Sequence, residues 1–158
     1  MNNSLAIANF FIIQANKEGF NINAQKLNKL IYLAHAWNLA LTNNNLFNED
    51  VICDIYGPLI RTPYHTFKLE LSKDKEQNIN LIALDSKGEP HKPLEENLPL
   101  LNKVWDTYKD YSGLVLSTLT HEKNSPWDIA RKEKLTYIPN AYIKKYYQTK
   151  ADINGVIL

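Results

Sequence analysis

The chain begins with apolar positions spaced three and four residues apart, which is the pattern of an amphipathic helix. These positions are Leu5, Ala8, Phe11, Ile12 and Ala15. Ser4 is suited to capping the start of this helix, and Gly19 is suited to ending it in the left-handed conformation. The pattern therefore predicts a first helix from Ser4 to about Lys17.

A second helical pattern follows Asn23, whose side chain is suited to an N-cap. Its apolar stripe consists of Leu27, Leu30, Ile31, Ala34, Trp37 and Leu41. The first two turns also carry a polar back, formed by Gln25, Lys26, Asn28 and Lys29. From Tyr32 to Leu41 almost every position is apolar, so we expect this helix at the centre of the fold, covered on several sides.

Turn and cap signals divide the rest of the chain. The asparagines at 43–45 predict a turn, and the β-branched run 51–55 predicts a short strand that ends at Tyr56-Gly57-Pro58. Further helices are expected from near Pro63, from Asn97, from Ser112, from Ser125 and over 137–147. Residues 72–97 are polar and are interpreted as an insertion, within which 78–84 is a candidate second strand pairing with 51–55.

This organisation predicts a mainly α protein. We expect a single domain over residues 1–158, with six to seven helices and room for a short two-stranded β element. The C-terminal run Val156-Ile157-Leu158 is apolar, and it is a candidate protease-recognition end or an added strand for a partner's sheet.

Composition narrows the function. The net charge of +1 gives little attraction to nucleic acid or to anionic membranes, and no run of about 18 apolar residues predicts a membrane span. Cys53 is the only cysteine, so no internal disulfide forms, which suits a reducing compartment, and we expect a cytoplasmic protein. The four histidines are scattered, and the five glycines form no phosphate-binding loop, so we expect neither a metal nor a cofactor.

The stretch LSTLTHEKNSPWDIAR, residues 116–131, gathers groups that occur in active sites. A small hydrolase built on His121 and Glu122, with Ser117 on the same helix face, is one hypothesis. It lacks a nucleophile elbow and an oxyanion turn. We favour a structural corner, in which His121 bonds helix-end carbonyls and Trp127 docks against the fourth and fifth helices. His35, in the apolar half of the second helix, is interpreted as a core histidine bonded to a neighbour.

The segment from Arg131 to Lys150 is basic, and tyrosines are interleaved with its cations. Such a face can contact phosphate and stack on bases, so a nucleic-acid-binding regulator is the main alternative function. The same lysines also suit the C-terminal dipole of a last helix, or an acidic protein partner.

Four blocks, residues 8–37, 39–60, 101–127 and 138–147, together resemble a known family. They carry the motif LxKLxY-A-x-W at Leu27, Leu30, Tyr32, Ala34 and Trp37, the motif YGP at Tyr56, Gly57 and Pro58, and the motif LTHxxxxPW from Leu119 to Trp127. In this order they resemble the Panacea domain of phage-associated, SocA-like antitoxins. Cys53-Asp54-Ile55 departs from the family pattern, which has a bulkier aromatic residue there, and 72–97 is also unusual.

The resemblance implies a mostly helical, non-enzymatic antitoxin that neutralises a toxin encoded beside it. Such antitoxins act by direct protein binding, and some deliver the toxin to a cytoplasmic protease. The segments that depart from the family pattern are candidates for selecting the toxin. Tyrosine, tryptophan and arginine are common binding hot spots. We therefore predict partner contacts at Tyr56, Arg61, His121, Trp127, Tyr142 and Tyr146, with no catalytic or metal-binding residue.

Overall fold

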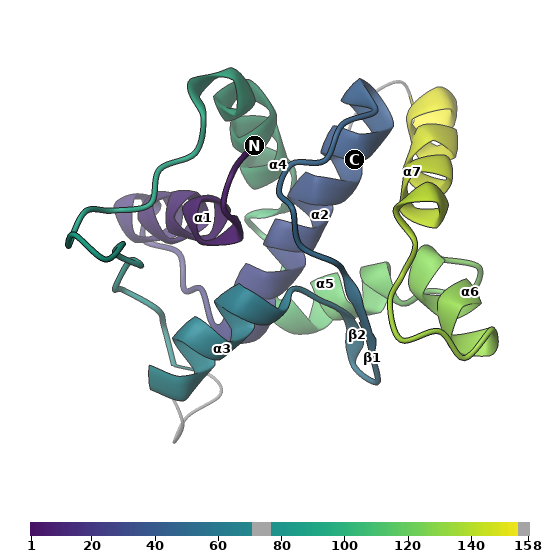
Figure 1. The fold of residues 1–158 in the computed structure, drawn as a ribbon, viewed down its shortest axis with the longest axis horizontal. Coiled ribbons are helices and arrows are strands. Elements are labelled where there is room, and N and C mark those ends of the chain that lie inside the picture. The colour runs from purple at the N-terminus through teal and green to yellow at the C-terminus, as the bar shows by residue number, and fades with distance from the viewer. Residues whose placement is uncertain (71–76, 155–158) are drawn as a thin grey trace.

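The computed structural model describes residues 1–70 and 77–154, and within them the chain is mainly helical (Figure 1). In chain order the elements are α1 (Ser4–Glu18), α2 (Ala24–Thr42), β1 (Ile52–Asp54), β2 (Gly57–Leu59), α3 (Arg61–Glu70), the 3-10 turn η1 (Glu95–Asn97), α4 (Leu98–Tyr108), α5 (Gly113–Thr120), α6 (Pro126–Lys132) and α7 (Asn140–Asn154). The seven α-helices and one short hairpin of these described residues confirm the predicted fold class.

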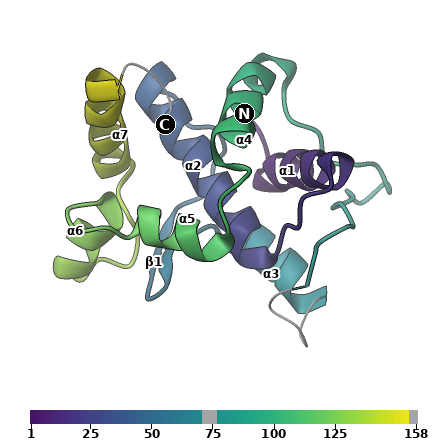
Figure 2. The same cartoon turned by 180° about the vertical axis from the view of Figure 1, so that it is seen from behind.

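Helix α2 passes through the middle of the molecule, and α1, α3, α4, α5 and α7 all pack against it (Figures 1 and 2). Every residue from Lys26 to Leu39 is buried. Trp37, in the C-terminal half of α2, is fully buried and donates its indole N–H to Tyr108 Oη at 2.9 Å. The prediction of a central second helix is therefore confirmed.

The polar back predicted for the start of α2 is wrong for three of its four residues. Lys26, Asn28 and Lys29 are 6%, 2% and 4% exposed, and only Gln25 faces water. The α4–α5 loop covers Lys26, whose ammonium donates to Lys109 O. The β1–β2 hairpin and the residues that follow it cover Asn28 and Lys29.

Side-chain caps begin three of the seven α-helices in the described residues as the sequence predicts. Asn23, Ser112 and Ser125 each accept a hydrogen bond from a backbone N–H three residues later. Two starts differ. Asn3, not Ser4, caps α1, and α3 begins at Arg61 rather than near Pro63, because the Glu49 carboxylate accepts the Thr62 N–H at 2.9 Å.

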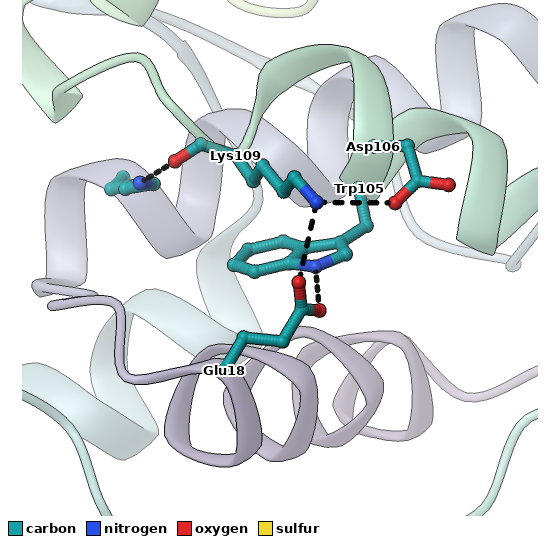
Figure 3. Close-up of polar contacts among 5 residues, drawn as sticks. Glu18, Trp105, Asp106 and Lys109 are labelled. Carbon is teal, nitrogen blue, oxygen red and sulfur yellow. Dashed lines mark hydrogen bonds and ion pairs between the residues drawn. The ribbon is translucent and has the colours of Figure 1, made fainter.

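A polar junction joins the C-terminal end of α1 to α4 (Figure 3). Glu18 Oε2 accepts the indole N–H of Trp105 at 2.5 Å, and Glu18 Oε1 lies 3.2 Å from Lys109 Nζ. Lys109 also lies 3.6 Å from Asp106. The pKa of Glu18 is lowered, mainly because the Trp105 hydrogen bond favours the ionised carboxylate.

The two strands form an antiparallel hairpin, with Ile52 opposite Leu59, Cys53 opposite Pro58 and Asp54 opposite Gly57. A third extended segment, residues 136–138, runs antiparallel along the other edge of β1. Cys53 N–H donates to Thr136 O, and Ile138 N–H donates to Val51 O, both at 2.8 Å.

The predicted pairing of 78–84 with 51–55 is wrong. Residues 136–138 and β2 already occupy the two edges of β1. The Asn9 side chain instead bonds both the N–H and the C=O of Ala83, at 2.7 and 2.8 Å. Ile79 N–H donates to Ile22 O, so this part of the predicted insertion packs against the body of the domain without forming a strand.

The C-terminal tail at Val156-Ile157-Leu158 and part of the predicted 72–97 insertion lie outside the described residues. Among the helices of the described part of the chain, none combines the length and the apolar character needed to cross a membrane.

Candidate partner-binding site

Side chains of α2 complete the outer edge of β2, where a larger sheet would have another strand. Lys29 Nζ donates to Pro58 O at 2.7 Å. One residue earlier on the helix, the Asn28 amide makes two hydrogen bonds with the backbone of Ile60. The central helix therefore sets the position of the hairpin directly.

Gly57 leaves the space that this arrangement needs. Its φ of +119° lies in the region that favours glycine, and a Cβ at this position would lie 2.9 Å from Lys29 Nζ and 3.6 Å from His121 Nδ1. A side chain here would therefore push against the buried ammonium. The glycine of the YGP motif thus brings together a lysine of α2 and a histidine at the end of α5.

Lys29 is a buried base in an environment of low polarity. Burial lowers its pKa from 10.5 to about 8, and the nearby Asp54 carboxylate opposes part of that shift. Its ammonium donates a hydrogen bond to Pro58 O. Most Lys29 side chains are still protonated at neutral pH, so this region of the fold contains a buried positive charge.

His121 ends α5 as its C-cap, but its imidazole does not have the predicted role. Its backbone N–H donates to Ser117 O at 3.1 Å, whereas the buried Nδ1 atom has no hydrogen-bond partner among the described residues. The ring lies against Trp127, with 5.3 Å between ring centroids. Among the described residues no hydrogen bond joins the His121 imidazole to the hydroxyl of Ser117, which accepts one from the Gln25 amide at 3.1 Å.

Trp127 fastens α6 to the hairpin. Its indole N–H donates to Asp54 O at 2.6 Å, and Cys53 Sγ lies 3.7 Å from Trp127 O. The Arg131 guanidinium lies 5.5 Å from the centre of its ring. The predicted docking of Trp127 on α4 and α5 is therefore only partly right, because β1, together with the end of α5, receives the indole.

Tyr56 lies at the turn of this hairpin and is 72% exposed. The structure thus brings Tyr56, His121 and Trp127 into one region. We call these three residues, together with Lys29 and Gly57, the hairpin cluster. Three of the expected contact residues therefore lie close together.

The other three expected contact residues have no direct contact with the hairpin cluster in the described structure. Arg61 is exposed at the start of α3. Tyr142, on α7, has a raised pKa because it hydrogen-bonds the Glu133 carboxylate, and Tyr146 packs edge-on against Tyr147 below Lys150. Their role as partner contacts stays a prediction.

Sequence reasoning missed Lys29, although the residue is part of the LxKLxY motif. A lysine placed between apolar positions of a central helix was the available signal, because a buried ammonium requires a nearby carbonyl or carboxylate. The same reasoning identified His35 correctly. It is fully buried, and its Nε2 lies 3.2 Å from Asn140 Oδ1.

Residues 1–70 and 77–154 contain no group of three or more His, Cys, Asp or Glu side chains that could hold a metal ion. The hairpin cluster offers two basic groups, an indole and an exposed tyrosine. Such groups are typical of a protein-binding surface, and the buried polar contacts described above hold them in position.

No curated protein and no solved structure was found to match this chain. The sequence does match one protein family, described as "Antitoxin SocA-like, Panacea domain", over residues 27–128. The matched region begins in α2, includes the hairpin and ends just after Trp127, so it contains the whole hairpin cluster. The chain belongs to the family of SocA-like antitoxins with a Panacea domain.

Proposed function

We propose that this protein neutralises a cognate toxin by binding it directly in the cytoplasm. The observation that supports the proposal most strongly is the arrangement of the three family motifs. Lys29, Gly57, His121 and Trp127 are distant in sequence, yet they meet beneath a hairpin whose turn residue Tyr56 faces solvent. An inhibitor that acts by binding needs a rigid scaffold beneath an exposed contact surface, and this cluster supplies both.

Delivery of the toxin to a cytoplasmic protease is a further step that the same binding would allow. An adaptor must hold the toxin before it passes the toxin on, so direct binding comes first in either mechanism. Measuring the toxin's half-life in cells with and without this protein separates the two. A shortened half-life supports delivery, whereas an unchanged half-life with full neutralisation supports binding alone.

The test of the proposed function is co-expression with the neighbouring gene. We expect the neighbour's product to arrest growth by itself, and we expect growth to recover when this protein is present. The two purified proteins should then form a complex. A harmless neighbour, or recovery of growth without a complex between the purified proteins, would contradict the proposal.

The alternative of a nucleic-acid-binding regulator predicts a different result. The described part of α7 carries exposed Lys145, but Tyr142 and Tyr146 are only partly exposed and already contact Glu133, Tyr147 and Lys150. Base stacking would require these rings to leave their neighbours. Binding to DNA or RNA that weakens steeply with added salt would support the regulator. No binding at low salt would exclude it.

A further inference from the structure

The hairpin and residues 136–138 form a small sheet with two very different faces. Cross-strand neighbours point to the same side of a sheet, and successive residues alternate between sides. Val51, Ile60 and Ile138 point inward and are at most 2% exposed. Ile52, Leu59 and Tyr137 therefore share the opposite side, because Ile52 pairs with Leu59 in β2 and with Tyr137 in the third segment.

This opposite side is apolar although it faces away from the core. Tyr137 is 47% exposed, Ile52 and Leu59 are partly exposed, and none of the three packs against the core. The solvent face of an antiparallel sheet is normally polar. An isoleucine, a leucine and a tyrosine side by side across three extended segments thus form an uncovered apolar strip.

The turn continues this strip. A two-residue hairpin turn usually consists of asparagine, aspartate or glycine, but here Ile55 and Tyr56 occupy it and are 61% and 72% exposed. The local backbone does not require apolar residues in the turn. Ile55 and Tyr56 both have negative φ, which any residue can adopt, and the positive φ is at Gly57. We call Ile52, Ile55, Tyr56, Leu59 and Tyr137 the outer hairpin face.

Charges of both signs border this face. Arg61 follows the base of β2, Lys134 precedes the third segment near the turn, and neither forms an ion pair with a described residue. Of the nearby carboxylates, Asp54 accepts the Tyr56 N–H at 3.2 Å, and Glu49 accepts hydrogen bonds from Ser4 and Thr62. Hydrogen bonds from neutral donors leave both carboxylates charged, and Asp50 adds a third, so the border of the face has no excess of positive charge.

We propose that the outer hairpin face is the surface that binds the toxin, and that it fits an apolar patch on that protein. The inference rests on the proposed function and adds the location and the chemistry of the contact. Ile55 and Tyr56, the two most exposed residues of the face, would enter this apolar patch. The buried contacts of Lys29 and Trp127 fix the conformation of the hairpin before the toxin binds, so less conformational entropy is lost on binding.

The test measures the affinity of purified variants for the toxic product of the neighbouring gene. Ile55→Lys and Tyr56→Ser change exposed side chains, so both variants should fold, and each should weaken binding by about thirtyfold. Tyr137→Ser should weaken it by about tenfold.

Matched controls change equally exposed side chains elsewhere. Leu114→Lys on α5 pairs with Ile55→Lys, since Leu114 is 70% exposed, and Tyr111→Ser pairs with Tyr137→Ser, since Tyr111 is 42% exposed. Both controls should keep the wild-type affinity within about threefold. Thermal melting of every variant shows whether it remains folded.

The possible outcomes are distinct. If the wild-type chain neither binds nor neutralises the toxin, the proposed function fails, and the surface fails with it. If the wild type binds and the folded face variants bind equally well, only the surface proposal is overturned. It is also overturned if sedimentation shows a wild-type dimer that Ile55→Lys separates while toxin binding is unchanged, because the face would then join two copies of this chain.

Discussion

Asn28 on α2 and Ile60 after β2 are joined by two hydrogen bonds. Asn28 Nδ2 donates to Ile60 O at 2.8 Å, and Ile60 N–H donates to Asn28 Oδ1 at 2.9 Å. Both residues are at most 2% exposed, so water cannot replace either bond. The amide side chain satisfies one residue of the hairpin edge just as a neighbouring strand would, and it fixes the path of the chain into α3.

Replacing Asn28 with leucine should therefore destabilise the protein strongly. The variant leaves the buried N–H of Ile60 without a partner, which costs on the order of 1–3 kcal/mol, and it removes one of the two hydrogen bonds to Ile60 O, worth about 1 kcal/mol, so that only the Tyr64 N–H at 3.3 Å still donates there. We expect the free energy of unfolding in urea to fall by about 2–4 kcal/mol. Asn102→Ala serves as the control, because that amide bonds only Leu98 O on an exposed turn. If both variants lose the same free energy of unfolding, the two buried Asn28 hydrogen bonds stabilise the protein no more than one exposed hydrogen bond.

Gly57→Ala and Gly88→Ala separate backbone strain from contact with Lys29. Both glycines have positive φ, +119° and +78°, so alanine is strained at either position. A Cβ at Gly88 would meet nothing within 4 Å, whereas a Cβ at Gly57 would lie 2.9 Å from Lys29 Nζ. We expect Gly88→Ala to lower the free energy of unfolding by about 1 kcal/mol, and Gly57→Ala by about 1 kcal/mol more.

The contact part of this loss should depend on Lys29. In a double-mutant cycle with Lys29→Met, the cost of Gly57→Ala should fall toward that of Gly88→Ala, because the methionine lacks the ammonium that the new methyl group would displace. Equal costs of Gly57→Ala in the two backgrounds would mean that strain alone accounts for the loss.

The Glu18–Trp105 junction should make stability depend on acid pH. A carboxyl whose pKa is lowered by folding stabilises the protein above its unfolded value, and this contribution is lost as pH falls through the folded value. Glu18→Gln should therefore melt at a lower temperature than the wild type at neutral pH. The two melting curves should converge as pH drops below the ordinary glutamate pKa of 4.5. A constant difference in melting temperature down to about pH 3 would contradict the linkage.

The helices were predictable because their signals are local. Asn23, Ser112 and Ser125 begin helices as N-caps, and Gly19 ends α1 with a φ of +78°. Apolar spacing in α2 was sufficient to place that helix at the centre. These features depend on residues within a few positions of one another, so one sequence contains all the information that they require.

The candidate site was predictable only as a set of motifs. Lys29 was assigned to an exposed back, because the sequence near α2 does not show that a hairpin and the end of α5 will cover it. The partner of 51–55 was misassigned for a related reason. The run 78–84 has strand-like residues, but Asn9 bonds its backbone across 74 positions of sequence. Contacts over such separations are decided by packing, not by local propensity.

Lys29 should make the protein more stable as pH rises through its pKa. Burial lowers the pKa of its ammonium from 10.5 to about 8, so the unfolded chain binds more protons between these values. The sign follows from linkage: the cost of burying the charge is fully present below pH 8 and is relieved as the folded lysine loses its proton. Between about pH 7 and pH 9.5, the free energy of unfolding should rise by about 2 kcal/mol from this group.

Urea unfolding of the wild type and Lys29→Met across this range measures the effect. Burial also raises the pKa of Tyr108 to about 12, and that shift works in the opposite direction because the unfolded tyrosine ionises first. Tyr108 is present in both proteins, so the difference between their two pH profiles isolates Lys29. A difference that grows with pH in favour of the wild type confirms the buried charge. Parallel profiles would show that Lys29 remains an ordinary solvated lysine, and that the hairpin is not positioned by a buried ammonium.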